Sequence, residues 1–242
     1  MKHCLHLMLS PVLLLLLVSC SVSKHNLVEE PTRPVKIVSL VHPINVVQKG
    51  VDLELGEQYA CTGFMIDRYF GITAAHCIIN QELGIMATQA IVADYESGTS
   101  GRIVDLEIPE CYFDSVSPLG SCDFAVFEVD SPVGGEAGTF NVKLPPVEFK
   151  GKRVESNAFL FDQLHNTVKS KGKVLAHKDN MVSTDQAVQP GMSGGALLFK
   201  GSAVGVLVAT GVNYSVCYPF RSQDIEYIER FVDERKWEKE RR

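Results

Sequence analysis

Short runs of β-branched and aromatic residues, separated by polar and turn-forming residues, recur along most of this chain. Runs of this length and composition are typical of β-strands. Six lie before residue 131, at Val35–Val41, Tyr59–Ile66, Tyr69–Thr73, Ala87–Tyr95, Gly101–Glu107 and Phe124–Val129. Six more follow residue 150, at Val154–Phe161, Val168–His177, Met181–Thr184, Gly194–Phe199, Ala203–Thr210 and Val216–Phe220.

The segment between the two groups, residues 131–150, carries three Pro and three Gly and shows no clear period. We interpret it as a crossing between two units, residues 35–130 and 151–220. Twelve short strands divided six and six predict an all-β pair of barrels or sandwiches.

Residues 221–242 change to a helical pattern. Ser222 is a suitable N-cap, and Asp224 follows in the first turn. Apolar residues recur on one face, at Ile225, Ile228 and Val232, with Trp237 as a possible extension. We therefore expect one C-terminal α-helix.

The N-terminus has the features of an export signal. Lys2 is followed by the apolar stretch from Leu5 to Val18, which is too short to span a membrane comfortably. The stretch ends in Leu17-Val18-Ser19-Cys20, which resembles a bacterial lipobox. This predicts that residues 1–19 are removed, that Cys20 carries lipid, and that residues 20–34 form a tether to the membrane of a bacterial envelope. The alternative is ordinary cleavage after Ser21-Val22-Ser23, which would give a secreted or periplasmic soluble protein.

Export gives the cysteines a structural meaning, because disulfides form in oxidising compartments. Cys61 with Cys77, and Cys111 with Cys122, would each close a short local loop. Cys217 is then left over. With 242 residues the chain can hold one ordinary domain or two small barrels, and a net charge of −6 argues against a nucleic-acid partner.

The strongest chemical signal is Pro190-Gly191-Met192-Ser193-Gly194-Gly195. A nucleophilic serine needs an exposed hydroxyl and nearby backbone N–H groups directed at the developing oxyanion, and glycines allow a turn that presents both. The N–H groups of Gly191 and Ser193 are the natural donors.

A candidate general base lies in Thr73-Ala74-Ala75-His76-Cys77, where a disulfide at Cys77 would hold His76 still. A third residue must orient the imidazole, and Asp123 stands at the start of the apolar run 123–127. Three other aspartates compete by chain order alone. Asp94 and Asp114 lack a following apolar run, and Asp130 ends one. The order His, Asp, Ser places base and orienting residue in the first unit and the nucleophile in the second.

These motifs resemble two groups of proteases. Residues 73–77 are similar to the histidine motif of trypsin-like proteases, including the disulfide partner Cys61, and residues 183–195 are closer to the serine motif of HtrA (DegP-like) proteases. Residues 166–174 also resemble the strand pair that precedes that motif. The resemblance implies two six-stranded antiparallel β-barrels with the active site between them. It also implies a serine endopeptidase acting on proteins or peptides through an acyl-enzyme, without a cofactor or metal.

Two departures from these families are visible. HtrA proteases carry PDZ domains after the catalytic domain, and here about 20 residues follow the last strand, so we expect no regulation by such modules in cis. Trypsin-like zymogens pair a freed N-terminal Ile with an Asp before the serine, a position that Met192 occupies here. We interpret Lys36-Ile37-Val38 as an ordinary strand start rather than as an activation site.

Three other hypotheses remain. The main one is an inactive protease homologue that serves as a binding module in the envelope. A metal site formed by Cys61, His76, Cys77 and Cys111 is weaker, because no paired Cys-x-x-Cys spacing occurs. An esterase would share the chemistry, but the alternating helices of α/β-hydrolases are absent from the pattern.

The resemblance also locates the substrate pocket. Its walls would be Ala187, Val188 and Gln189, and then Val208, Ala209, Thr210 and Gly211. No acid or histidine lies in these walls, and we interpret Asp185 as structural. A buried Lys or Arg side chain of the substrate would therefore lack its charge partner. We expect Val, Ala, Leu or Ile at P1.

Overall fold

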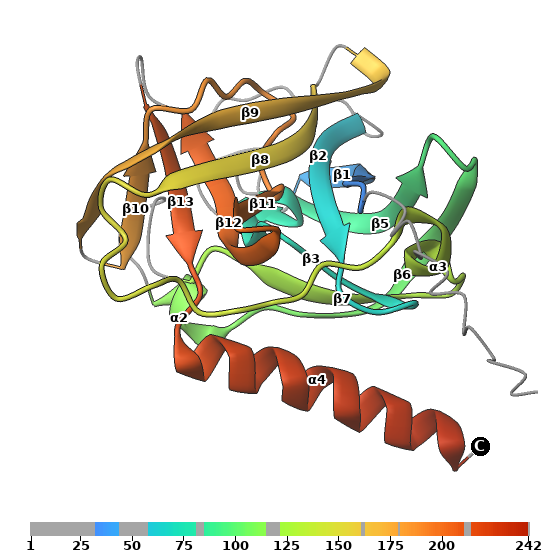
Figure 1. Cartoon of the computed structure of the whole chain (residues 1–242). Coiled ribbons are helices and arrows are strands. Elements are labelled where there is room, and N and C mark those ends of the chain that lie inside the picture. Colours follow the sequence, from blue (N-terminus) through green and yellow to red (C-terminus); the bar gives the residue numbers. More distant parts are fainter. Residues whose placement is uncertain are drawn as a thin grey trace, which may run out of the picture.

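The computed structural model describes residues 32–43, 58–80, 85–114, 122–160, 163–178, 180–210 and 214–241. These residues form two curved β-sheets with one long helix lying along one side (Figure 1). The predicted signal segment and Cys20 lie outside the described residues. Among the described helices, none is long and apolar enough to cross a membrane.

The first sheet has the strand order β1-β2-β3-β7-β6-β5-β4, and the additional pairing of β1 with β5 brings its ends together. Its neighbouring strands are antiparallel. Apolar side chains such as Phe64, Ile72 and Phe127 fill its interior and are fully buried. The strands are β1 (Val35–Pro43), β2 (Gln58–Met65), β3 (Phe70–Thr73), β4 (Ile79–Asn80), β5 (Ile85–Asp94), β6 (Thr99–Glu107) and β7 (Ala125–Val129).

The second sheet closes into a barrel in the order β10-β13-β12-β11-β8-β9. A separate apolar cluster, including Val154, Leu197 and Leu207, fills it. The strands are β8 (Arg153–Leu160), β9 (Gln163–Lys178), β10 (Met181–Thr184), β11 (Ala196–Phe199), β12 (Ser202–Thr210) and β13 (Ser215–Pro219).

The predicted architecture of two antiparallel barrels and a C-terminal helix is confirmed, and each predicted run corresponds to a strand. The first barrel has seven strands rather than the six that we expected, because the two-residue strand β4 pairs with β5. Some boundaries differ. β11 begins at Ala196 because Gly194, with φ of +85°, still belongs to a turn. The very short elements β4, η1 (Ala75–Cys77), α2 (Glu110–Phe113) and α3 (Val133–Ala137) were not predicted, since two to five residues are too few to show a period.

The crossing between the barrels is partly ordered against both. It begins with α3, and further along the N–H of Lys143 donates to the carbonyl of Ala203 at the start of β12 (2.9 Å). Residues 32–34, which we expected in the tether, also lie on the first barrel. The N–H of Arg33 donates to the carbonyl of Ala137 (2.8 Å), and its guanidinium pairs with Asp94 (2.8 Å).

Helix α4 (Ser222–Glu240) leaves the second barrel and lies under the first (Figure 1). Its N-cap is Arg221, one residue before the Ser222 that we expected, because the Asp224 carboxylate accepts the N–H of Arg221 (2.7 Å). Ile228 and Phe231 are buried against the first barrel, whereas Trp237 is 57% exposed and does not extend this face. The helix therefore ties the end of the second barrel to the first.

Candidate active site

His76 is positioned by the first barrel and by a disulfide. It lies in the short turn η1 directly after β3, and Cys77 in the same turn is bonded to Cys61 of β2. The predicted pairs Cys61–Cys77 and Cys111–Cys122 are both present, and Cys217 is the free, buried cysteine among the described residues. His76 is thus fixed from one side by strand β3 and from the other side by the disulfide to β2.

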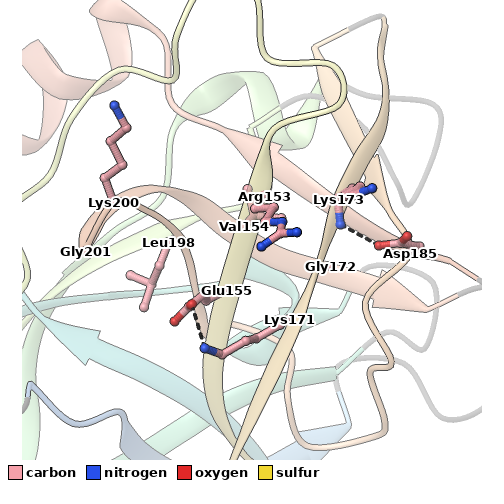
Figure 2. Close-up of a pocket in the computed structure, with 10 residues that line it drawn as sticks. All are labelled: Arg153, Val154, Glu155, Lys171, Gly172, Lys173, Asp185, Leu198, Lys200 and Gly201. Carbon is pink, nitrogen blue, oxygen red and sulfur yellow. Dashed lines mark hydrogen bonds and ion pairs between the residues drawn. The ribbon is translucent and has the colours of Figure 1, made fainter.

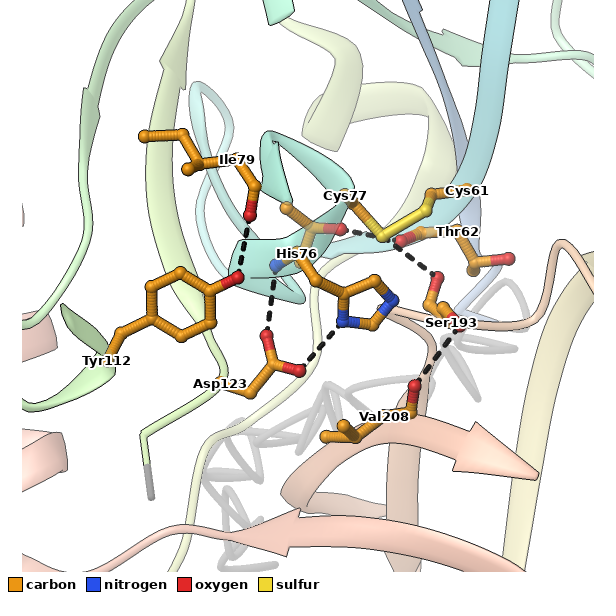
Figure 3. A network of polar contacts seen from close by, with 10 residues as sticks. Cys61, Thr62, His76, Cys77, Ile79, Tyr112, Asp123, Ser193 and Val208 are labelled. Carbon is orange, nitrogen blue, oxygen red and sulfur yellow. Dashed lines mark hydrogen bonds and ion pairs between the residues drawn. A yellow bond between two sulfur atoms is a disulfide. The ribbon is translucent and has the colours of Figure 1, made fainter. Parts of the chain in front are cut away.

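Asp123 reaches His76 through both of its carboxylate oxygens (Figure 3). Oδ2 lies 2.7 Å from Nδ1 of the ring, and Oδ1 accepts the backbone N–H of His76 at 3.0 Å. The Asp123 side chain is fully buried. A carboxylate at this position selects the tautomer that carries its proton on Nδ1 and leaves Nε2 free to accept a proton.

The same pair sets the basicity of His76. Burial lowers the pKa of the imidazole, but the negative charge of Asp123 and the hydrogen bond to it have the larger combined effect, so the pKa is raised above its ordinary value. A base with a raised pKa accepts a proton more readily from a hydroxyl.

The competing aspartates have other partners. Asp94 pairs with Arg33, and Asp130 accepts the N–H of Arg102 at 2.9 Å and pairs with its guanidinium. Asp114 lies at the end of α2. The structure therefore brings Asp123 to His76, as the sequence predicted.

Ser193 lies on the other side of the imidazole ring, in the glycine-rich turn before β11 (Figure 3). Gly191 and Gly194 have φ of +95° and +85°, which L-residues rarely adopt. A Cβ at Gly194 would lie 2.0 Å from the carbonyl oxygen of Thr62, so only glycine fits there. The Ser193 hydroxyl donates to the carbonyl of Val208 (3.3 Å) in this structure.

The proposed oxyanion donors lie in the same turn. The carbonyl of Met192 accepts the N–H of Gly195 (3.0 Å), which directs the Ser193 N–H to the opposite side of that peptide. Within the described part of the chain, neither Gly191 nor Ser193 donates its N–H to another backbone group.

Met192 is buried in the core of the second barrel, where its sulfur accepts the N–H of Gln189 (3.3 Å). Ile37 is fully buried inside β1. Apolar packing thus occupies both positions that a zymogen-type ion pair would use, which agrees with the interpretation of residues 36–38 as a strand start.

The predicted pocket walls lie at the second barrel. In the first wall, Ala187 and Gln189 are exposed and Val188 is half-buried. In the second wall, Val208 is buried, Ala209 is half-buried and β12 ends at Thr210, whereas Gly211 lies outside the described residues. Asp185 directs an oxygen to the N–H of Lys173 in β9, which agrees with a structural role.

Two residues at the site escaped the sequence analysis. Gln186, just before the first wall, is buried, and its amide bonds Ser156, Thr184 and the carbonyl of Ser170. Thr62 is buried beside Cys61, and its hydroxyl donates to the carbonyl of Gly191 (2.8 Å). Both make contacts distant in sequence, which no local pattern indicates.

The cluster considered for a metal does not offer free ligands. The side chains of Cys61, His76 and Cys77 lie close together, but the two sulfurs are bonded to each other, and Cys111 is bonded to Cys122. Burial raises the pKa of the Cys217 thiol to about 12, so it stays protonated.

A cavity of about 530 Å³ lies elsewhere, on the outer face of β8, β9 and β11, and charged side chains such as Arg153 and Lys173 line part of it (Figure 2). Lys171 pairs there with Glu155 (3.0 Å), directly opposite it in the sheet. Both side chains of this pair are exposed, at 71% and 54%. We interpret this cavity as part of the solvated barrel surface.

Comparison with known proteins gives one family. The Trypsin family model matches residues 42–220. No curated protein sequence matches the chain significantly.

Solved structures share the fold at low sequence identity. A Glu endopeptidase in complex with MPD has a TM-score of 0.66 and 18% identity, over 82% of this chain and 90% of that one. The scabies mite inactivated protease paralogue S-I1 has a TM-score of 0.62 and 13% identity, over 85% and 99%. The HtrA-type protease AlgW with a decapeptide has a TM-score of 0.58 and 15% identity, over 85% and 66%. The chain belongs to the trypsin family of serine proteases.

Proposed function

We propose that this protein is a serine endopeptidase that cleaves peptide bonds through an acyl-enzyme, with His76, Asp123 and Ser193 as its triad. The observation that carries the proposal is the buried carboxylate of Asp123, bonded to both the ring and the backbone of His76. That arrangement raises the pKa of a histidine whose ring lies next to Ser193. A histidine without a catalytic role would not need a buried carboxylate to orient its ring.

The chemistry follows from this geometry. After rotation about its Cα–Cβ bond, the Ser193 hydroxyl would leave the carbonyl of Val208 and give its proton to Nε2 of His76. Its oxygen attacks the carbonyl carbon of the substrate, and the N–H groups of Gly191 and Ser193 stabilise the oxyanion. His76 then gives the proton to the departing amine, and water releases the acyl group by the reverse sequence.

An inactive homologue is the second candidate. The Ser193 hydroxyl donates to Val208 in this structure, and structural relatives include scabies mite inactivated protease paralogues. Such a protein would bind peptides in the same cleft without cleaving them. The presence of all three triad side chains and both turn glycines favours the enzyme.

Reaction with a fluorophosphonate separates the two candidates. An activated serine forms one covalent adduct, which peptide mapping should locate on Ser193. Ser193→Ala should give no adduct, and His76→Ala should react far more slowly. Absence of labelling in folded wild-type protein would support the inactive homologue.

We further propose that the P1 side chain is small or medium aliphatic: Val, Ala, Leu or Ile. Among the described wall residues, Ala187, Val188, Val208 and Ala209 are apolar, and the polar Gln189 carries no charge. The buried amide of Gln186 is already hydrogen-bonded. The Asp185 carboxylate is directed at the backbone of β9 and offers no charge to a basic substrate.

Export with a lipid on Cys20 is our proposal for location, and it rests on the sequence alone. Mass spectrometry of the mature protein should find residue 20 at the N-terminus, blocked and diacylated, and the protein in the membrane fraction. A free N-terminus near Lys24 in a soluble fraction would contradict this and support ordinary secretion.

A further inference from the structure

Thr62 lies where the two barrels meet the glycine-rich turn of residues 191–195, which carries Ser193 and is called the serine turn below. It is the fifth of the eight residues of β2, and its side chain is fully buried. Its hydroxyl donates to the carbonyl of Gly191 (2.8 Å) and accepts the N–H of Phe159 in β8 (3.0 Å). Its own N–H donates to the carbonyl of Ser193 (2.8 Å). One residue therefore bonds the turn at two points and the second barrel at a third.

Thr62 is also connected to the base. The preceding residue, Cys61, is bonded to Cys77, and Cys77 follows His76 directly. Ser193 and His76 come from different barrels, so their separation depends on how the barrels and the turn are joined. Thr62 is linked to His76 through the Cys61–Cys77 disulfide and to Ser193 through the hydrogen bonds to its turn.

We propose that Thr62 is a positioning residue for the peptidase reaction, and that its hydroxyl sets the serine turn relative to His76. This inference rests on the proposed function. The carbonyls of Gly191 and Ser193 belong to the peptide units on either side of the one that carries the Ser193 N–H. With both carbonyls held by Thr62, the turn cannot rotate as a body away from the imidazole.

The effect belongs to the transition state rather than to substrate binding. A displacement of about 1 Å between reacting groups can cost roughly 100-fold in rate. The hydrogen bonds of the Thr62 hydroxyl go to Gly191 and Phe159, and not to the described wall residues 187–189 and 208–210. We therefore expect the hydroxyl to govern kcat while KM stays close to its original value.

A purely structural role is the competing explanation, because a buried N–H of Phe159 without its acceptor destabilises any protein. Ser215 supplies a control. Its side chain is equally buried, on β13 of the second barrel, and its hydroxyl hydrogen-bonds the hydroxyl of Thr184 (2.5 Å). Thr62→Val and Ser215→Ala each remove one buried, hydrogen-bonded hydroxyl.

The test compares wild type, Thr62→Val, Thr62→Ala, Thr62→Ser, Ser215→Ala and Ser193→Ala on one peptide substrate, with thermal unfolding of each. Thr62→Val should lower kcat by about 10–100-fold at unchanged KM, and fluorophosphonate labelling should slow in parallel. The acidic limb of the pH profile, which His76 and Asp123 set, should not move. Thr62→Ser should recover most of kcat, and Ser215→Ala should lose stability with little change in kcat.

Three results would overturn the inference. The first is a Thr62→Val enzyme with wild-type kcat. The second is a loss of kcat in both Thr62→Val and Ser215→Ala, in the same proportion to their loss of stability. The third is failure of Thr62→Val and Thr62→Ala to fold at all, which would assign the residue to folding. Wild-type protein without activity that depends on Ser193 would instead refute the proposed function, and this inference with it.

Discussion

The two halves of the candidate site are held in place by different means. On the first barrel, His76 and Asp123 each adjoin a disulfide, at Cys77 and Cys122. On the second barrel, Ser193 lies in a glycine-rich turn that hydrogen bonds hold in place. Thr62 donates to carbonyls of this turn, and the N–H of Gly194 donates to the carbonyl of Leu207. Within the described residues, the second barrel contains no disulfide.

This difference matches what each half has to do. A histidine whose pKa is raised by a neighbouring carboxylate must keep one geometry relative to it, and covalent links beside both residues secure that geometry. The nucleophile needs a tight turn that only glycine permits, together with a hydroxyl that can rotate. Covalent links therefore fix the half that holds His76 and Asp123, whereas Ser193 keeps a rotatable hydroxyl where the bond to the substrate would form.

The largest effect is expected when either half loses its reacting group. Ser193→Ala or His76→Ala should lower kcat by about 10⁴–10⁶-fold, with KM nearly unchanged, because triad members act as a unit. Steady-state kinetics on one peptide substrate measures this, with circular dichroism to verify folding. Activity that survives Ser193→Ala would show that another residue is the nucleophile.

Asp123→Asn should rank next, at about 10⁴-fold in kcat, since the amide favours the wrong tautomer of His76. The pH profile provides a second readout. His76 acts as a base only when neutral, so activity rises as pH increases through its pKa. Asp123 raises that pKa against the effect of burial, so its replacement should move the acidic limb to lower pH.

Asp130→Asn is the matched control for this variant, because Asp130 is partly exposed and pairs with Arg102 on the surface. It should leave both the rate and the pH limb close to wild type. If Asp130→Asn or Asp94→Asn were inactive while Asp123→Asn kept its activity, the assignment of the third triad member would be wrong.

The disulfides should have a smaller effect, chiefly on stability. Cys61 and Cys77 are 16 residues apart, and removal of such a link by double alanine substitution should cost about 2–4 kcal/mol of unfolding free energy. Denaturant unfolding measures this, and kcat should fall as His76 loosens. The double substitution of Cys111 and Cys122 should instead act through Asp123 and shift the pH limb. Equal kinetics in both double variants and wild type would contradict the role assigned to the covalent links.

Specificity should show the smallest effect and should reside in the second barrel. Matched peptides that differ only at P1 should be cleaved about 10–100-fold faster with Leu or Val than with Arg, because a buried guanidinium would lack a charge partner. A clear preference for Arg that Asp185→Ser abolishes would overturn this proposal.

The sequence revealed features that depend on local pattern or on a compact motif. The strands were visible as apolar runs, and both disulfides followed from cysteines that close short loops. The pairing of His76 with Asp123 followed from a motif and from the position of Asp123 at a strand start. Each of these signals is confined to a few neighbouring residues.

Long-range hydrogen bonds gave no such signal. The bond from Thr62 to Gly191 joins residues 129 positions apart. Threonine is common in β-strands, so its presence in β2 gives no indication of this contact. The docking of Arg33 on Asp94 likewise depends on the folded surface of the first barrel. Such contacts follow from the way the elements pack, which the pattern of apolar residues does not specify.

The most direct test of the central claim is cleavage of a diverse peptide library by the mature protein, with Ser193→Ala as the control. Mass spectrometry of the products identifies each bond that is cut. The triad account predicts internal cleavage by the wild-type protein, with the same fold but no cleavage in Ser193→Ala. Identical product patterns from both proteins, or no products from a correctly folded wild type, would contradict it.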